Sequence, residues 1–223
     1  MEAPLGQELP QEACSSENEV YACLLDVPNS SPGIDGLSVN TPKTVWQSPT
    51  WRTWIILLFS ACIIHGTHPA TFKTAEVVMI PKPHKEDMSD TANWRPISLL
   101  PCLGKGLERL MARRLINCAL PNRIIPPQLL GGLKARSTED IIRCLINDIE
   151  KAWNEGKVAT LITMDIKSAY DSVLPGRLAR RLQEQGWPLW VCRWVANFAA
   201  GRKAAIRIDS FLSEPRSLQH GLP

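Results

Sequence analysis

The chain has 223 residues, enough for one sizeable core or for one domain and part of a second. Apolar residues make up 44% of it and aromatic residues 6%, values typical of globular proteins that argue against wholesale disorder. The net charge of +3 conceals an asymmetry: no Lys or Arg precedes Lys43, whereas residues 43–223 contain 25 basic and 15 acidic residues, a net charge of +10. Such a basic body fits a polyanionic partner, and an ordinary solvated surface explains it equally well.

Turn residues and hydrophobic periodicity divide the chain into alternating helices and strands, an α+β or α/β arrangement. Residues 1–31 are acidic and punctuated by Ser and Pro, which predicts a flexible tail. Ser137 or Thr138 is suited to be the N-cap of one helix. The expected helices cover residues 46–65, 103–119, 137–155, 175–186 and 188–200, and the expected strands cover residues 74–80, 158–164, 203–208 and 212–218. The first helix is apolar enough to be buried on most sides.

Seven cysteines are spread along the chain without a C-x-x-C pair. This pattern predicts reduced, mostly buried thiols in an intracellular protein, nuclear or cytoplasmic, that is not secreted. The N-terminus lacks the basic and apolar regions of a signal peptide, and the most apolar run, residues 54–64, is too short to span a bilayer. No membrane partner is therefore expected.

The run from Val158 to Met164 (VATLITM) is almost continuously apolar, which predicts a central strand buried on both faces. Asp165 follows it directly, and a carboxylate at the end of a buried strand is well placed to bind Mg²⁺. By itself the pattern is weak, because such an Asp can equally cap the following turn. A phosphatase site of the Asp-x-Asp type is excluded, since Lys167 stands two positions after Asp165.

The segment MDIKSAYDSV, residues 164–173, resembles motif A of reverse transcriptases, D-[IV]-x-x-A-[FY]-D. The resemblance implies that Asp165 binds the two catalytic ions, Mg²⁺ or Mn²⁺, and that Tyr170 lies under the sugar of the incoming nucleotide and excludes a 2′-OH. The ions would activate the primer 3′-OH and stabilise the leaving pyrophosphate. Tyr170 could instead be a core aromatic residue, and Asp171 is interpreted as a helix cap.

Residues 80–115 resemble the fingers segment of reverse transcriptases from non-LTR (LINE-type) retrotransposons. They contain IPKP at 80–83 and NWRPISLLPCLGKGLERLMARRL at 93–115. The resemblance implies that Lys82, Arg95 and Lys105 bind the nucleotide triphosphate, for which Arg offers a planar fork and Lys a point charge. The alternative is that these residues tie the fingers together or contact template phosphates.

Three shorter segments continue the resemblance. PGIDG at 32–36 matches the family's PG-x-DG element, and GGLKARSTED at 131–140 matches FG…GRST-x-D, with Leu130 in place of Phe and Ala135 in place of Gly. A backbone that requires positive φ would be strained at Ala135. Arg136 is expected to contact nucleic acid, or to pair with an acidic residue at the start of the next helix. QHGLP at 219–223 resembles the start of motif B, where Gly221 would lie against the template and the nascent base pair.

The resemblance covers residues 32–223 and implies a right-hand polymerase fold of class α+β. Helical fingers (32–156) and an incomplete split βαβ palm (157–223) would follow the tail (1–31). The implied function is RNA-templated DNA synthesis, with RNA template, DNA primer and dNTPs as partners and an endonuclease among the other domains of a retroelement polyprotein.

Two further expectations concern activity and the Trp-rich helix. Motif C of reverse transcriptases contains an Asp-Asp pair that supplies the other carboxylates for the metal ions, and no such pair occurs in the sequence. A polypeptide of these 223 residues is therefore expected to be inactive alone. The alternative is a non-catalytic, nucleic-acid-binding remnant of a decayed element. Trp187, Trp190 and Trp194 have helical spacing and are expected in the core rather than as base-stacking platforms.

Overall fold

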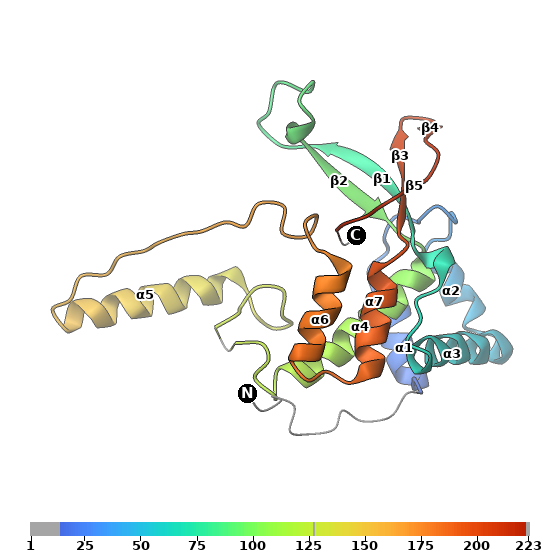
Figure 1. Cartoon of the computed structure of the whole chain (residues 1–223), viewed down its shortest axis with the longest axis horizontal. Helices are drawn as coiled ribbons and strands as arrows, with labels where there is room; N and C mark the ends of the chain where they lie inside the picture. Colours follow the sequence, from blue (N-terminus) through green and yellow to red (C-terminus); the bar gives the residue numbers. More distant parts are fainter. Residues whose placement is uncertain (1–13, 127, 222–223) are drawn as a thin grey trace.

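The computed structural model describes residues 14–126 and 128–221, in which a group of helices supports one small sheet (Figure 1). The α-helices are α1 (Glu17–Leu24), α2 (Asn40–Val45), α3 (Pro49–Ile64), α4 (Cys102–Ala119), α5 (Thr138–Asn154), α6 (Pro175–Glu184) and α7 (Leu189–Ala199). The strands are β1 (Thr74–Pro81), β2 (Trp94–Leu99), β3 (Lys203–Ile208), β4 (Phe211–Leu212) and β5 (Arg216–Ser217), and short 3-10 turns, η1 (Ala70–Phe72) and η2 (Thr91–Asn93), precede β1 and β2. None of the helices described is long and apolar enough to cross a membrane.

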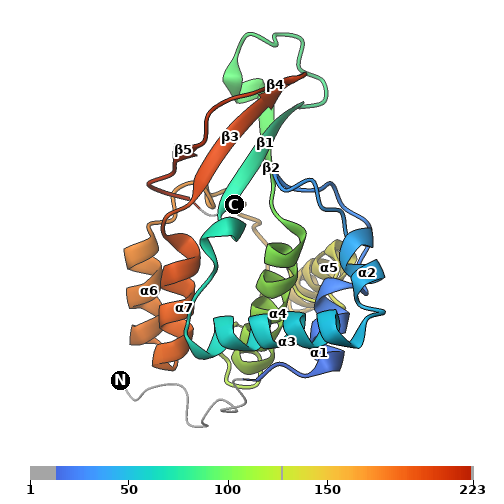
Figure 2. The ribbon, with the colours of Figure 1, turned by 90° about the vertical axis from the view of Figure 1, so that its right-hand side faces the viewer.

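The sheet is mixed, with strand order β2-β1-β3-β4 and with β5 also paired to β3. β1 is antiparallel to β2, with Val78 opposite Ile97, and parallel to β3, with Val78 beside Arg207. Parallel strands need a long crossover, and here the chain between β1 and β3 passes through β2 and α4–α7. Figure 2 shows the strands rising from the helices, so that the tip of the sheet stands clear of the core.

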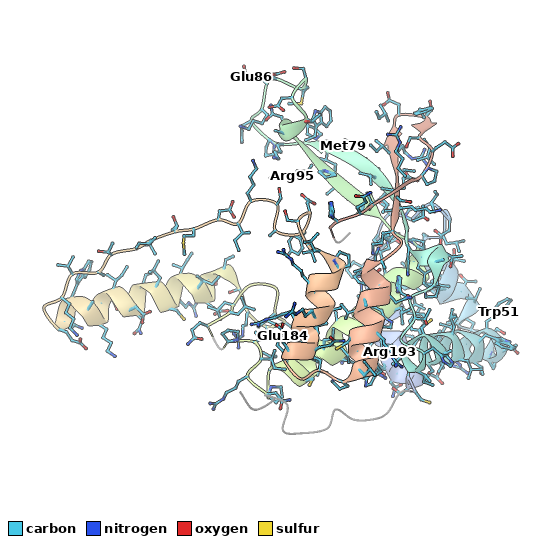
Figure 3. The ribbon with its side chains drawn as sticks, viewed as in Figure 1. Trp51, Met79, Glu86, Arg95, Glu184 and Arg193 are labelled. Carbon is cyan, nitrogen blue, oxygen red and sulfur yellow. The ribbon has the colours of Figure 1, made fainter. Side chains whose placement is uncertain are left out.

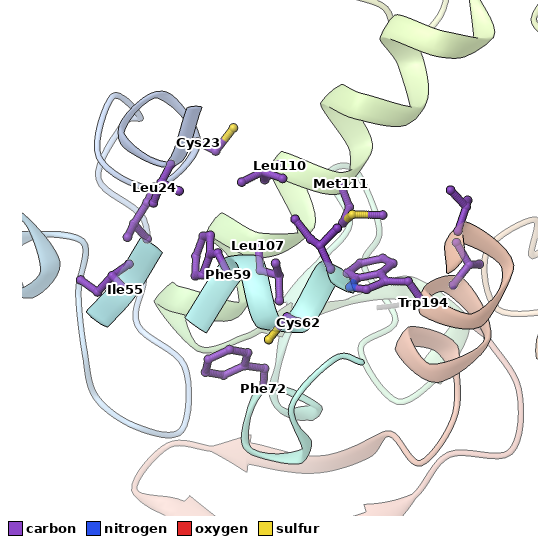
Figure 4. Packing of buried hydrophobic residues seen from close by; sticks show 14 of the residues in the cluster. Cys23, Leu24, Ile55, Phe59, Cys62, Phe72, Leu107, Leu110, Met111 and Trp194 are labelled. Carbon is purple, nitrogen blue, oxygen red and sulfur yellow. The ribbon is translucent and has the colours of Figure 1, made fainter. Parts of the chain in front are cut away.

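The hydrophobic core lies between α1, α3, α4 and α7 (Figure 4). α4 contributes Leu107, Leu110 and Met111, all fully buried. Phe59 of α3 and Leu24 of α1 are equally buried and belong to the same cluster. The helix expected over residues 103–119, observed as α4, therefore lies at the centre of the core.

Helix α1 corrects the prediction of a flexible tail over residues 1–31. Its Val20 and Leu24 are fully buried, and Arg114 of α4 donates to both carboxylate oxygens of Glu19, at 2.7 and 2.6 Å. The acidic composition was misleading because this acid pairs with the basic side of α4, while apolar residues at helical spacing enter the core. Residues 1–13 lie outside the described part of the chain.

The other predicted helices are confirmed with shifted ends. The helix expected over residues 46–65 corresponds to α3, which begins only at Pro49, a residue without an N–H that suits the first turn of a helix. The short helix α2 before it was not predicted. The burial on most sides predicted for α3 is wrong, since Trp51, Trp54 and Leu57 are each more than half exposed. Helix α5 begins after Ser137, one of the two predicted N-caps, and Asp140 completes a capping box with it, which was not predicted.

The cysteines and tryptophans behave largely as expected. Five of the seven cysteines are buried, and all seven are free thiols. Trp187 and Trp194 are 7% and 3% exposed, which confirms their place in the core, and Trp190 packs against it.

The predicted central strand over residues 158–164 is not formed. The segment is extended but pairs with none of the described strands, and Val158 and Met164 are each 91% exposed. Helix α5, which precedes it, has no buried residue, and both lie apart from the body of the molecule (Figure 1). The prediction is wrong because an apolar segment becomes a central strand only where neighbouring strands satisfy its backbone groups, and no described strand lies beside this one.

Two smaller differences concern the sheet. β2 was not predicted as a strand. It lies at the edge of the sheet, where the missing N–H of Pro96 is tolerated. The strand expected over residues 212–218 is divided into β4 and β5, both of which pair with β3.

Candidate functional site

Asp165 lies at the end of the extended segment that follows α5. Residues 157–172 are exposed throughout, and Tyr170 is 75% exposed. The Asp165 carboxylate is therefore open to solvent, and Tyr170 is not the core aromatic residue that the alternative interpretation expected. The predicted helix-capping role of Asp171 is also wrong, because α6 begins after Leu174 and has no side-chain cap.

The turn that follows Asp165 ends against Gly221. The N–H of Gly221 donates to the carbonyl of Val173 at 2.9 Å, and a Cβ placed on Gly221 would lie 3.3 Å from the Cα of Asp171. Gly221 also has a φ of +89°, so both the close approach and the backbone angle favour glycine. Residues that resemble motif A and residues that resemble the start of motif B are thus in contact.

Lys82 and Arg95 lie on the hairpin formed by β1 and β2. Ile80 is opposite Arg95 in this hairpin, and because side chains alternate between the two faces, Lys82 and Arg95 project from the same face. The Lys82 ammonium donates to the carbonyl of Ala92 at 2.7 Å, which closes the hairpin loop. Arg95 is exposed, and in Figure 3 it lies on the hairpin above the extended segment. The sheet therefore brings two predicted phosphate-binding residues together.

Lys105 contacts the loop that contains PGIDG. Its ammonium donates to Ser30 Oγ at 3.0 Å and to the carbonyl of Ser31 at 2.8 Å, and burial lowers the pKa of Lys105. A Cβ on Gly33 would lie 2.4 Å from the carbonyl carbon of Leu100, so the loop can approach the start of α4 only with glycine at this position. These contacts are those of a residue that ties the region together, and they use two of the three ammonium N–H groups.

Arg136 folds back on the loop that precedes α5. Its Nη1 donates to the carbonyl of Leu129 at 2.6 Å. Hydrogen bonds from Ser137 lower the pKa of Asp140, and the charge of Arg136 adds to this effect. Ala135 has a φ of 60°, the left-handed conformation that the family's usual glycine would adopt without a penalty of about 1 kcal/mol. The strain expected at this substitution is therefore present.

Within residues 14–126 and 128–221, no group of three or more His, Cys, Asp or Glu side chains is arranged to bind a metal ion. Asp165 does supply a hard carboxylate oxygen, the ligand type that Mg²⁺ prefers, and its exposure leaves room for water or phosphate oxygens. This residue fits a divalent ion as one ligand, and further carboxylates are needed for a pair of metals.

A buried polar cluster, which the sequence did not reveal, connects α7 and β3 to α4 and β1. Glu108 of α4 accepts a hydrogen bond from Arg202 at 3.4 Å and lies 3.5 Å from Nε2 of His68. Lys73 donates to the carbonyl of Asn197 at 2.6 Å. Burial, together with the charges of Arg202 and Lys73, lowers the pKa of His68 to about 3, so its imidazole is neutral. Isolated polar residues between apolar ones are too common a pattern to predict such a cluster.

Comparison with known proteins identifies the family of the chain. The family described as reverse transcriptase (RNA-dependent DNA polymerase) matches residues 80–223, and the chain belongs to this family.

Its relatives make the resemblance more specific. The RNA-directed DNA polymerase from mobile element jockey of Drosophila melanogaster is 29% identical over 227 residues, and the probable RNA-directed DNA polymerase from transposon BS of the same species is 28% identical over 224 residues. The Retrovirus-related Pol polyprotein from type-1 retrotransposable element R1 of Bradysia coprophila is 30% identical over 225 residues. These matches cover 98–100% of this chain but 21–24% of the relatives, so the chain spans about a quarter of their length. The predicted likeness to reverse transcriptases of non-LTR retrotransposons is confirmed.

Proposed function

We propose that this chain forms the fingers and the first part of the palm of a polymerase that synthesises DNA on an RNA template. The contact between Gly221 and the turn at Asp171–Val173 carries the proposal, because it supports one site shared by motif A and motif B residues. In this proposal residues 32–156 are the fingers and residues 157–223 belong to the palm of a right-hand fold. RNA template, DNA primer and dNTPs are the partners, and the seven free thiols support action inside the cell.

Asp165 and Tyr170 are assigned to the reaction centre. Asp165 would hold divalent ions, Mg²⁺ or Mn²⁺, through its exposed carboxylate. Such ions, when bound, activate the primer 3′-OH and stabilise the charge on the leaving pyrophosphate. Tyr170 presents an exposed ring in the turn after Asp165, where it can lie under the nucleotide sugar and exclude a 2′-OH.

Basic residues of the fingers are assigned to phosphate groups. Lys82 and Arg95 project from one face of the hairpin, which supports joint binding of the nucleotide triphosphate. Lys105 and Arg136 are proposed to add contacts with nucleotide and nucleic acid, respectively. Because both already hold loops through hydrogen bonds, their contribution includes positioning those loops.

Helix α5 and residues 158–164 expose apolar side chains, as the first part of a palm would before its remaining strands cover them. Ile142, Ile146 and Trp153 of α5 are exposed, and the segment that follows is equally apolar. We propose that the two cover each other within a sheet that further strands complete. The greater length of the relatives supports additional domains, including an endonuclease, in the intact polyprotein.

Primer extension by a chimaera tests the proposed function. Residues 32–221 replace the matching segment of the jockey polymerase from Drosophila melanogaster, and extension is measured with RNA template, DNA primer, dNTPs and Mg²⁺ or Mn²⁺. We expect extension that Asp165→Asn abolishes and that the matched variant Asp171→Asn largely retains. Equal extension by the chimaera and its Asp165→Asn variant would contradict the assignment.

The 223-residue polypeptide provides a second comparison. Because its sequence has no Asp-Asp pair, we expect it to bind an RNA–DNA hybrid in a salt-dependent way without extending the primer. Robust extension that depends on Asp165 would refute the expected inactivity. A purely non-catalytic remnant is not favoured, because residues 80–223 match the family of reverse transcriptases and the relatives named above are described as RNA-directed DNA polymerases.

A further inference from the structure

Arg207 of β3 lies on the same face of the sheet as Lys82 and Arg95. Val78 is beside Arg207 in the parallel pairing and opposite Ile97 in the antiparallel pairing. Paired residues share a face, and faces alternate along each strand, so Arg207 projects with the two basic residues of the hairpin. The sheet therefore gathers on one face three basic residues from three different strands or their ends.

The spacing within this face suits one extended anionic ligand. Arg207 and Arg95 are separated by two strand spacings across the sheet and by two residues along it, which places their Cα atoms about 12 Å apart. Both carry long side chains that can converge on phosphate groups between them. Lys82 lies beyond Arg95 toward the tip of the hairpin and can contact the same ligand.

Glu76, on the same face, fixes the guanidinium of Arg207. Nε of Arg207 donates to one carboxylate oxygen of Glu76, and Nη2 donates to the other at 2.9 Å. Glu76 is 8% exposed, whereas the side chain of Arg207 is 39% exposed. The hydrogen bonds from Arg207 lower the pKa of Glu76, so the carboxylate stays ionised and the pair stays formed at neutral pH.

The ion pair leaves donors of Arg207 for a second ligand. A guanidinium has five N–H groups in a rigid fork, and the pair with Glu76 uses two of them. Among residues 14–126 and 128–221, none of the other three has a hydrogen-bond partner. A donor set that is held in place by a buried acid and opens to solvent is suited to phosphate oxygens.

We propose that Arg207 is a further phosphate-binding residue and that Glu76 positions it. The inference rests on the proposed function and extends the phosphate-binding face from the β1–β2 hairpin to β3. The phosphate belongs either to the incoming nucleotide or to the backbone of the bound hybrid, which present the same chemistry to a guanidinium.

Two binding measurements on the 223-residue chain separate these sources. One measures a dNTP with Mg²⁺ by equilibrium dialysis, and the other measures a labelled RNA–DNA hybrid by fluorescence anisotropy over a range of NaCl concentrations. We expect Arg207→Gln to weaken one of the two by about tenfold. If the ligand is the hybrid backbone, the slope of log K against log salt also falls by about one.

Arg216→Gln is the matched control. Arg216 lies on β5 and pairs with Ala204, one residue before Ala205, the partner of Glu76, so it projects from the opposite face. The variant removes the same charge from the same sheet, and we expect both affinities to stay within about twofold. Equal losses in Arg207→Gln and Arg216→Gln would overturn the proposal, because general electrostatic attraction would then account for both.

Glu76→Gln distinguishes positioning from simple charge. This variant raises the net charge by one, so electrostatic attraction alone predicts tighter binding, whereas loss of positioning predicts weaker binding and a smaller salt slope. Arg207→Lys keeps the charge without the fork, and we expect intermediate affinity. If circular dichroism shows that Arg207→Gln does not fold, Arg207→Lys takes its place as the test. Binding by Arg207→Lys equal to that of the unmodified chain would then overturn the proposal.

The outcomes also separate this inference from the proposed function. An unmodified chain that binds neither ligand would overturn both. An unmodified chain that binds, with Arg207→Gln binding equally well, would overturn the inference alone.

Discussion

Gly221 is the residue through which the C-terminal segment meets the turn after Asp165. Its φ of +89° and the 3.3 Å separation of a Cβ from Asp171 both disfavour a side chain. We predict that Gly221→Ala weakens this contact by about 1–2 kcal/mol, seen as faster hydrogen exchange over residues 168–173. Gly176→Ala is the control, because a Cβ there meets no atom within 4 Å and the helix α6 should gain slightly in stability. Similar exchange in both variants would refute the prediction.

His68 couples the buried polar cluster to pH. Burial and the charges of Arg202 and Lys73 lower its pKa to about 3 in the fold, whereas an unfolded His titrates near about 6.5. Because the folded pKa is the lower one, the stability from this group is complete above the unfolded pKa. It is lost as the pH falls from there toward the folded pKa.

We predict that, as the pH falls from about 6 to 5, protonation of His68 in the unfolded chain lowers the free energy of unfolding by about 1.4 kcal/mol per pH unit. Urea denaturation at several pH values should show a flatter dependence for His68→Phe. The comparison with the variant matters, since burial raises the pKa of Glu108, which acts in the opposite sense. His65→Phe, at the exposed end of α3, is the control and should keep the steep dependence. An unchanged slope in His68→Phe would contradict the account.

Helix α1 shows, at the scale of elements, that a segment of acidic composition can belong to the core. Leu24 is fully buried in α1, and Leu57 of α3 is 53% exposed. We predict that Leu24→Ala lowers the free energy of unfolding by about 2–4 kcal/mol, whereas Leu57→Ala changes it by less than about 1 kcal/mol. Urea denaturation with unchanged m-value measures both. Equal, small effects would indicate that α1 is not part of the folded core.

Helix α5 and the segment after it show the opposite case. The capping box at Ser137 and the apolar stripe specify a helix from within, so α5 forms without packed neighbours. The apolar segment 158–164 has no comparable internal source of hydrogen bonds, because a strand satisfies its backbone groups only through neighbouring strands. Local signals therefore predicted one of these elements correctly and failed for the other.

The molecule as a whole exposes an apolar surface made of α5 and residues 158–164. Val158 is 91% and Ile162 is 78% exposed, next to unpaired backbone groups. We predict concentration-dependent self-association of the 223-residue chain, because such surfaces and unpaired strands associate. Sedimentation velocity should show less association for the double variant Val158→Lys, Ile162→Lys.

Leu189→Lys is the control for that measurement, since Leu189 is 55% exposed at the start of α7, away from this surface. It should associate as strongly as the unmodified chain. A chain that remains monomeric at high concentration would contradict the prediction.

The sequence by itself determined the family, most of the helices and the candidate site residues. Spacing around Asp165 and around Arg95 carried the resemblance, and the substitution at Ala135 predicted the left-handed strain that the structure contains. These successes share a cause: helical period, caps and turns involve residues a few positions apart, so their energetics are contained in short stretches of sequence.

Only the tertiary structure decided which segments meet. It placed α1 in the core, left residues 158–164 unpaired, brought Gly221 to Asp171, and joined Glu76 to Arg207 across 131 positions of the chain. Such pairings depend on the register of strands and on which apolar faces bury each other, small differences between large opposing free energies summed over the whole chain. No short stretch of sequence contains that sum, and for this reason the basic face shared by β1, β2 and β3 became apparent only in the folded sheet.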